Sequence, residues 1–198
     1  MKNQLATRSR EGGPALAARA RQTLIYTQAV FFCALAVCLV IKHGHVAETD
    51  GISFYGVYPP TMPALFTGYL VGAAGLWWTS GQFVAAGAPR WTLVAMRVIA
   101  TGLVVLLATP YNPGTFLNWA HMSVGVTMGV AQVALVVDLL RRRRNPGLVT
   151  GACVGLFGGV LGAISLPDWH ITLLLEGETL LEVGFAWCLI EWTHGLER

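Results

Sequence analysis

Residues 24–41, LIYTQAVFFCALAVCLVI, form an almost unbroken apolar run. The hydrocarbon core of a bilayer is about 30 Å thick, and a helix needs roughly 20 mainly apolar residues to cross it. A strand of a transmembrane barrel would instead alternate apolar and polar residues with a period of two, and this run does not alternate. The run therefore predicts a transmembrane α-helix and argues against a barrel.

The composition of the whole chain extends this interpretation. Of its 198 residues 55% are hydrophobic and 12% are charged, and the mean hydropathy is +0.59, which lies outside the range of a soluble domain. Six stretches are long and apolar enough to cross a membrane: 23–42, 63–80, 91–109, 118–139, 147–165 and 170–192. We predict an all-α integral membrane bundle of six transmembrane helices over 23–192, with a basic N-terminal segment, 1–22, and a short tail, 193–198.

The basic residues predict the orientation of this bundle, because cytoplasmic flanks retain Lys and Arg near the ends of helices. With the N-terminus inside, the cytoplasmic side receives Lys2, Arg8, Arg10, Arg19, Arg21, Arg90, Arg141, Arg142, Arg143, Arg144 and Arg198. Only Lys42 falls outside. We therefore expect both termini to be cytoplasmic and the bundle to lie in the plasma membrane. The net charge of +3 then reflects topology and attraction to anionic membrane lipids, and it requires no nucleic acid as a partner.

Small residues indicate which helix faces point inward. The stretch 147–165 follows a plausible cap, Asn145, and a first-turn proline, Pro146. It then carries glycines at four-residue spacing, which are Gly147, Gly151, Gly155 and Gly159. Such a stripe is typical of a helix that presses against a neighbouring backbone.

A polar stripe follows the same logic in the stretch 118–139. His121 lies one and two turns before Gly125 and Gly129 on one helix face, and Gln132 lies nearly in line with it. We therefore predict that His121 faces protein rather than lipid. Gln132 is either a buried interhelical hydrogen-bonding group or part of a functional site.

The last apolar stretch contains four glutamates, Glu176, Glu178, Glu182 and Glu191. Glu176 and Glu191 lie near its ends and can reach the headgroups. A carboxylate near the bilayer centre costs about 3 kcal/mol, so Glu178 and Glu182, one turn apart, should face the bundle interior or a wet cavity. Two carboxyl groups this close repel when both are ionised, which predicts that one of them holds a proton and can serve as an acid.

Arg97 is the other costly residue, about two turns inside the predicted third helix. Its partner could be Glu182, Glu191 or Asp138. A structural ion pair is one interpretation, and a role in proton coupling or in holding an anionic ligand group is the other.

Polar side chains also gather at the predicted outer helix ends, where His43, His45, Glu48 and Asp50 follow the first helix. Imidazole and carboxylate are good zinc ligands, but a His-x-His pair on a loop lacks the i, i+4 spacing of a preformed helical site. The four cysteines form no CxxC motif. We expect no resident metal and no cofactor.

The stretch DGISFYGVYPPTMPALFTGYLVGAAGLWW, residues 50–78, resembles the first outer loop and second helix of a bacterial six-helix membrane domain of unknown function, distantly similar to DRAM-type proteins. This resemblance contains no catalytic motif and implies six helices but no activity. In size and character the chain is also similar to the small membrane-bound terpene cyclases of actinomycetes, which begin cyclisation with an intramembrane carboxylic acid. That likeness is architectural and transfers no residue.

Three classes of function fit these observations. The first is an intramembrane enzyme for a lipid-soluble isoprenoid or terpenoid substrate, with Glu182 or Glu178 as general acid. Its candidate substrate-binding residues are His121, Phe185, Gln132, Arg97 and Trp119. Phe185 shares a helix face with Glu182, and an aromatic ring there could stabilise a cation.

The second class is a small-molecule carrier or the membrane subunit of a transporter with an outward-facing polar site. The third is a structural subunit whose polar groups only hold helices together.

Overall fold

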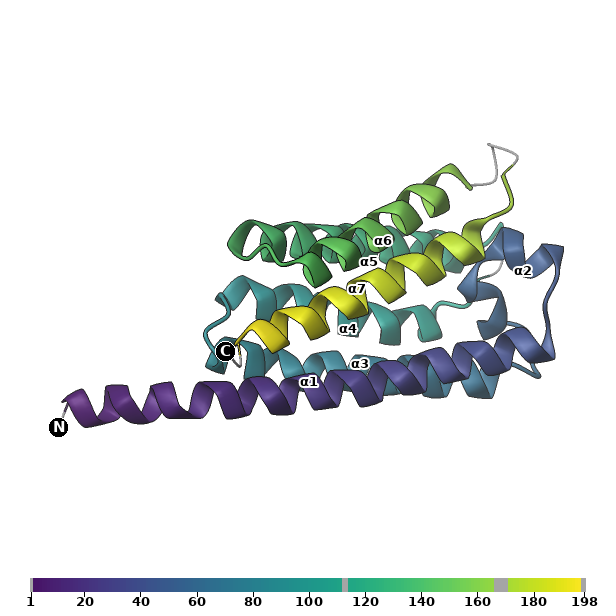
Figure 1. Ribbon diagram of the computed structural model, residues 1–198. Helices are drawn as coiled ribbons and strands as arrows, with labels where there is room; N and C mark the ends of the chain where they lie inside the picture. The colour runs from purple at the N-terminus through teal and green to yellow at the C-terminus, as the bar shows by residue number, and fades with distance from the viewer. Residues whose placement is uncertain (1, 112–113, 166–170, 197–198) are drawn as a thin grey trace.

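The computed structural model describes the backbone of residues 2–111, 114–165 and 171–196, and the side chains of 13–44, 48–111, 114–165 and 171–196. Within these ranges the protein is all-α, as predicted (Figure 1). Its helices are α1 (Lys2–Ile41), α2 (His45–Asp50), the 3-10 helix η1 (Ile52–Gly56), α3 (Met62–Ala85), α4 (Arg90–Ala108), α5 (Phe116–Arg142), α6 (Pro146–Ile164) and α7 (Leu174–Leu196).

Four of these helices are long and apolar enough to cross a membrane, which identifies the chain as a membrane protein. They are Gly13–Ile41 of α1, and α4, α5 and α6. α3 and α7 are also long, with 24 and 23 residues, but they are not among these four; α7 carries the four glutamates, and α3 carries hydroxyl groups and several glycines. Length and apolar character alone thus support four of the six predicted spans.

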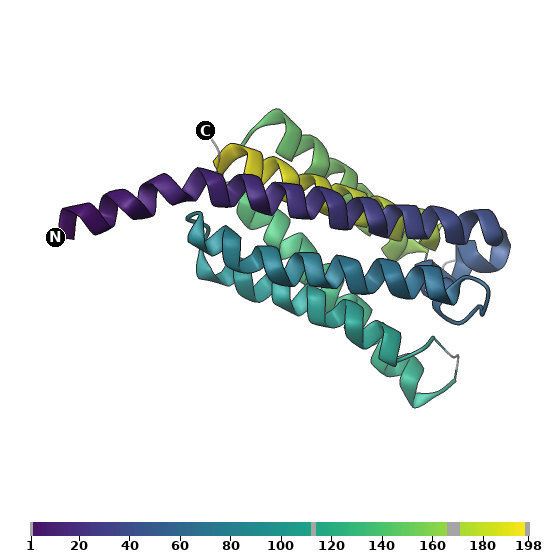
Figure 2. The same ribbon diagram turned by 90° about the horizontal axis from the view of Figure 1, so that it is seen from below.

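The ends of several helices differ from the prediction. α1 is continuous from Lys2, so no change of secondary structure separates the predicted segment 1–22 from the first span, and this helix runs on beyond the bundle (Figure 2). α7 begins at Leu174 rather than at 170. α2 and η1 were not predicted, because such short helices carry no apolar periodicity.

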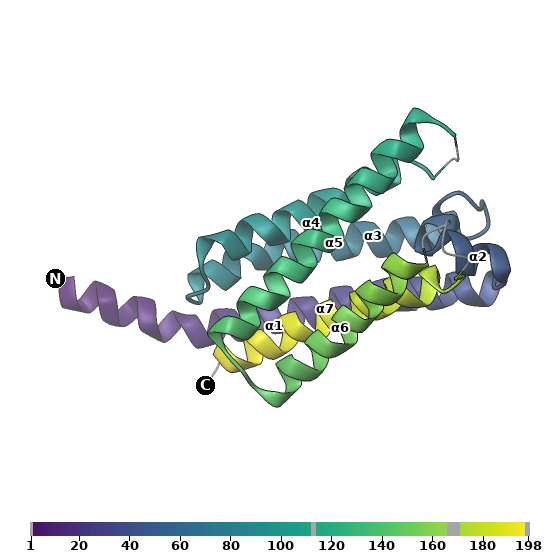
Figure 3. The same cartoon turned by 90° about the horizontal axis from the view of Figure 1, so that it is seen from above.

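The long helices run up and down the bundle, and both termini lie at the same end (Figure 1). We call this the terminal end, and the opposite end, which holds α2 and η1, the η1 end. α1 packs on α3 and α7, α3 on α4, α4 on α5, and α6 most extensively on α7. α5 makes few contacts with α6 and α7, and it diverges from them towards the η1 end (Figure 3).

Glycines set the close packing of α6 on α7. A Cβ atom on Gly184 would collide with the backbone of Gly155, and one on Gly177 would collide with the backbone of Gly162. The sequence analysis expected the glycine stripe of α6 to contact a neighbouring backbone, and this is confirmed at Gly155. Gly159 has ordinary contact with the side chain of Leu181, 3.7 Å from the position of a Cβ, so it lies outside the tight seam. The predicted cap of α6 is also present, since Asn145 Oδ1 accepts the Leu148 N–H at 2.6 Å.

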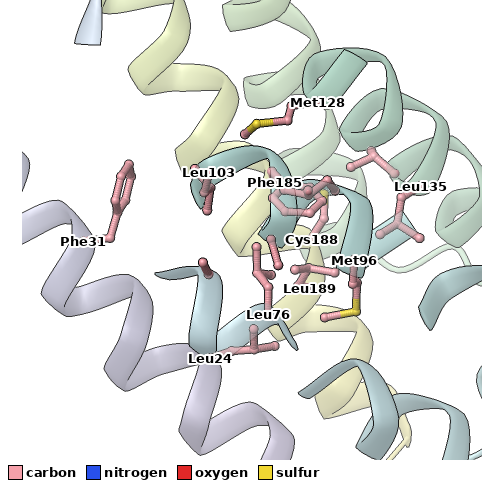
Figure 4. Close-up of a cluster of buried hydrophobic side chains, with 14 of the residues drawn as sticks. Leu24, Phe31, Leu76, Met96, Leu103, Met128, Leu135, Phe185, Cys188 and Leu189 are labelled. Atoms are coloured by element: carbon pink, nitrogen blue, oxygen red, sulfur yellow. The ribbon is translucent and has the colours of Figure 1, made fainter. Parts of the chain in front are cut away.

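The hydrophobic core extends along the bundle, from Leu148 at the start of α6 to Tyr55 of η1. Its side chains come from all six long helices and include Leu24, Leu76, Met96, Leu135, Phe185, Cys188 and Leu189 (Figure 4). The half of the bundle nearer the η1 end also contains the candidate site.

Candidate functional site

A cavity of about 740 Å³ occupies the η1 half of the bundle. Its walls come from α1, α3, α4, α5, α6 and α7, and residues of α2 and η1 close its end. Small-molecule sites typically measure about 300–1,000 Å³ and have mainly apolar walls. The lining is of this kind, because most of it consists of aliphatic side chains and glycines.

The glycines of α5 leave room for this cavity. Gly125 and Gly129 both line it, and a Cβ atom added to either would meet nothing within 4 Å. These two glycines therefore face empty space and not a neighbouring backbone, in contrast to Gly155 and Gly184.

The mouth of the cavity opens sideways between α5 and α6. Val126 and Val130 on α5 and Val160 on α6 line the cavity, yet they are 63%, 64% and 61% exposed. A side chain that is exposed on the bundle surface and also lines the cavity lies at the rim of the cavity mouth. α5 and α6 are both candidate membrane spans, so this rim lies between two helices that are apolar enough to contact the hydrocarbon of a bilayer.

Glu178 projects from α7 into the η1 end of the cavity. Its Oε2 accepts the Ile52 N–H at 2.7 Å, so the carboxyl group caps the first residue of η1. Gly51, directly before η1, has a positive φ of 70°, and a Cβ there would lie 2.5 Å from Glu178 Oε2. A glycine at this position therefore satisfies both the backbone conformation and the close approach of the carboxyl group.

Glu182 lies one turn further along α7 and also lines the cavity. Its Oε1 accepts a hydrogen bond from Gln132 Nε2 on α5 at 2.7 Å. Gln132 is 1% exposed. The buried interhelical hydrogen bond that the sequence analysis considered for it is therefore present, and its acceptor, Glu182, belongs to the candidate site. With Oε1 occupied as an acceptor, the proton of a neutral Glu182 belongs on Oε2.

His121 faces the interior of the bundle, as predicted. It is 6% exposed and lines the cavity. Its Nδ1 lies 2.5 Å from the Thr109 carbonyl oxygen, which can only accept, so Nδ1 carries a hydrogen. The neutral ring then offers Nε2 as an acceptor to the Ser53 hydroxyl group, 2.7 Å away. His121 thus ties α5 to both η1 and the end of α4.

Two aromatic rings in the cavity wall were missed by the sequence analysis. Phe31 of α1 and Tyr69 of α3 line the cavity side by side, with ring centroids 5.9 Å apart. Tyr69 lines the same cavity as Glu178 and Glu182. Its position in mid-helix between Gly68 and Gly72 was an available signal, since interfacial tyrosines lie near helix ends.

Three of the proposed substrate-binding residues lie away from the cavity. Phe185 is 1% exposed and belongs to the hydrophobic core (Figure 4). Trp119, near the start of α5, is 74% exposed. Arg97 stacks on Trp77 at the surface of the bundle, with 4.7 Å between the guanidinium carbon and the ring centroid. The structure therefore brings together Glu178, Glu182, Gln132 and His121, and it separates them from these three.

None of the three predicted carboxylates pairs with Arg97 in the part of the chain that the structure describes. Asp138 accepts hydrogen bonds from Trp91 and Arg142, at 2.9 and 2.6 Å. Glu182 is bonded to Gln132, and Glu191 lies against Gly147 of α6.

Polar groups also line the η1 end of the cavity. Asp50 and Tyr111 join His121 and Ser53 there. Burial raises the pKa of the Asp50 carboxyl group, and burial together with the charge of Asp50 raises the pKa of Tyr111. Among the described residues no three His, Cys, Asp or Glu side chains are grouped so that they could hold a metal ion; the His45 side chain, which belongs to the outer histidine and acid cluster, lies outside the described residues.

Comparisons with family models, with curated proteins and with solved structures give no match for this chain.

Proposed function

We propose that this protein is an intramembrane enzyme that acts on a lipid-soluble isoprenoid or terpenoid substrate by carboxylic-acid protonation, in the manner of the terpene cyclases that it resembles in architecture. The observation that carries the proposal is the placement of Glu178 and Glu182 on the wall of an apolar cavity whose mouth lies between two candidate membrane spans. A hydrocarbon substrate can enter such a cavity from the bilayer without crossing water.

Glu182 is the proposed proton donor. It would transfer the proton on Oε2 to one carbon of a substrate alkene, forming a C–H bond and leaving a carbocation on the other carbon. A second alkene of the same substrate closes a ring by forming a C–C bond to this cation. Loss of a proton from the cyclised cation to the Glu182 carboxylate restores the acid, so the net reaction is an isomerisation and needs no cofactor.

The cavity wall suits a cationic intermediate. The faces of Phe31 and Tyr69 can attract a cation by about 1–2 kcal/mol when water is excluded, and both rings line the cavity that contains Glu182. In this proposal these two rings take the role that the sequence analysis assigned to Phe185. The hydrogen bond from Gln132 holds the carboxyl group of Glu182 in one orientation.

Deuterium incorporation tests the reaction class without knowledge of the product. Membranes containing the protein are incubated in D₂O with linear polyprenyl alcohols or squalene, and extracted products are analysed by mass spectrometry. The Glu182 proton exchanges with D₂O between turnovers, so we expect isomeric products that carry one deuterium per protonation event. If no tested polyene gains deuterium above the level in membranes without the protein, isoprenoid protonation is wrong.

A carrier is the second candidate function. The specific observation in its favour is that Asp50, Ser53, Tyr111 and His121 line the same cavity at its η1 end, which gives a polar approach to the glutamates from that side. The D₂O experiment separates the two functions, because a carrier releases its substrate chemically unchanged.

We further propose that α3 and α7 also span the membrane, giving six spans with both termini in the cytoplasm of a plasma-membrane protein. In support, α3 packs between α1 and α4, and α7 packs on α1 and α6; the arginines at 90 and 141–144 and both termini lie at one end of the bundle.

We expect a protease tag at either terminus to be cleaved in broken cells but not from outside intact cells. The control is the same tag inserted after Gly114 in the loop before α5, which should be cleaved from outside. A terminal tag that is cleaved in intact cells would contradict the orientation.

A further inference from the structure

We propose that Arg97 and Trp77 form a binding site for the phosphate group of an anionic membrane phospholipid on the side of the bundle that faces lipid. This site is separate from the cavity, and the inference does not depend on the reaction proposed above.

The first step is the environment of Arg97. It lies in α4, a candidate membrane span, where an uncompensated charge is costly. Val94, one turn before Arg97, is 58% exposed, and Val98, the next residue, is 40% exposed. Residues at i, i+3 and i+4 share a helix face, so Arg97 lies on a face of α4 that is directed away from the core.

The second step is the missing anion. In the described residues Arg97 forms no ion pair, and the three carboxylates that could have served are engaged or placed elsewhere. Its Nε is enclosed without a hydrogen-bond partner, whereas its two terminal nitrogens are not enclosed in this way. The guanidinium group is therefore supported by the protein but neutralised by none of its described side chains.

The third step is the depth of the group. Arg97 lies seven residues after Arg90, the first residue of α4, which is about 10 Å along the helix. Long arginine side chains at this depth reach towards the headgroups. Trp77 and Trp78, 49% and 66% exposed, lie on the same end of α3, and exposed tryptophans are typical of the membrane interface.

The fourth step is the chemistry of recognition. The flat guanidinium group stacks on the Trp77 ring, with 4.7 Å from its central carbon to the ring centroid. This contact fixes the position of the guanidinium, and its terminal nitrogens, which have no hydrogen-bond partner among the described residues, are free to donate to two phosphate oxygens. A lipid phosphate supplies the missing negative charge at the depth where Arg97 lies.

Lipid titration of the purified full-length protein tests the proposal. Native mass spectrometry measures the affinity for short-chain phosphatidylglycerol, for phosphatidylcholine and for inorganic phosphate. Wild-type protein should bind phosphatidylglycerol preferentially, because the phosphate of phosphatidylcholine is partly neutralised by its own choline group. Arg97→Gln should weaken the binding of phosphatidylglycerol by about tenfold or more, since a hydrogen-bonded charge pair is lost.

Matched variants exclude trivial explanations. Arg90→Gln removes an equal charge from an exposed position on the same helix and should change the affinity by less than about twofold. Arg97→Lys keeps the charge but not the planar fork and should give an intermediate loss, which protects the test if Arg97→Gln folds poorly. Trp77→Leu should also weaken the binding.

Three results would overturn the proposal. One is unchanged phosphatidylglycerol affinity in folded Arg97→Gln or Arg97→Lys, and another is an equal loss in Arg90→Gln. The third is displacement of the lipid by an equal concentration of inorganic phosphate, which would make a free anion the ligand.

Discussion

Glu182→Gln should abolish deuterium incorporation while leaving the protein folded. Gln has the size of Glu, and its amide oxygen can still accept the hydrogen bond from Gln132, but it cannot deliver a proton. Removal of a general acid lowers rates by about 10²–10⁴-fold, and we expect a loss in this range. The measurement is the initial rate of deuterium uptake, normalised to folded protein.

Glu178→Gln is the matched control on the same helix face. Its amide oxygen can still accept the Ile52 N–H, so the cap of η1 should persist. We expect a smaller loss of rate, because Glu178 serves here as a neighbouring carboxyl group and not as the donor. If Glu182→Gln retains more than a tenth of the wild-type rate, or if Glu178→Gln is the more damaging change, Glu182 is not the proton donor.

A structural role for Glu182 makes a different prediction. If the carboxyl group only joins α7 to α5 through Gln132, then Glu182→Leu should destabilise the protein by leaving the amide unpaired. The double variant Glu182→Leu with Gln132→Leu should then recover much of the lost stability together with activity. In the catalytic interpretation the double variant recovers stability but stays inactive.

Gly184→Leu should cause the largest loss of stability of any substitution considered for this chain. A Cβ at Gly184 already collides with the backbone of Gly155, and neither backbone can move without separating α6 from α7. We expect a cost of about 3 kcal/mol or more, at the upper end of the range for overpacked cores. Thermal unfolding in detergent measures it.

Gly129→Leu is the matched control for that variant. It makes the same chemical change in a long apolar helix, but at a position where a Cβ meets nothing within 4 Å. Its stability should stay close to that of the wild type. Because Gly129 lines the cavity, the added side chain should fill part of the site and lower the rate of substrate turnover. Similar melting temperatures for the two leucine variants would contradict the assignment of tight and open glycines.

The helices were largely predictable because their apolar runs end at recognisable signals. Asn145 and Pro146 marked the start of α6 correctly, for example. η1 could not be predicted in this way, because its start depends on Gly51 and on a carboxyl group from α7, 126 residues away from Ile52 in the chain. A short helix held by a distant side chain leaves no local pattern.

Helical periodicity likewise predicted part of the site. It placed His121, Gln132, Glu178 and Glu182 towards the interior, where the structure has them. It could not place Phe185, which shares the direction of Glu182 but lies three residues, or about 4.5 Å, closer to the terminal end. At that depth the helices close into the hydrophobic core. Periodicity gives the direction of a side chain, but not whether a neighbouring helix has diverged there.

In the six-span arrangement proposed above, the order of the chain bears on how the glutamates of α7 enter the bilayer. Two carboxyl groups near the centre of a span cost about 3 kcal/mol each against insertion, which would make α7 a poor segment on its own. The groups that hydrogen-bond to them, the Ile52 N–H and the Gln132 amide, both belong to earlier parts of the chain. These partners are therefore synthesised before α7, so in the proposed arrangement α7 can insert next to groups that are able to hydrogen-bond its carboxyl groups.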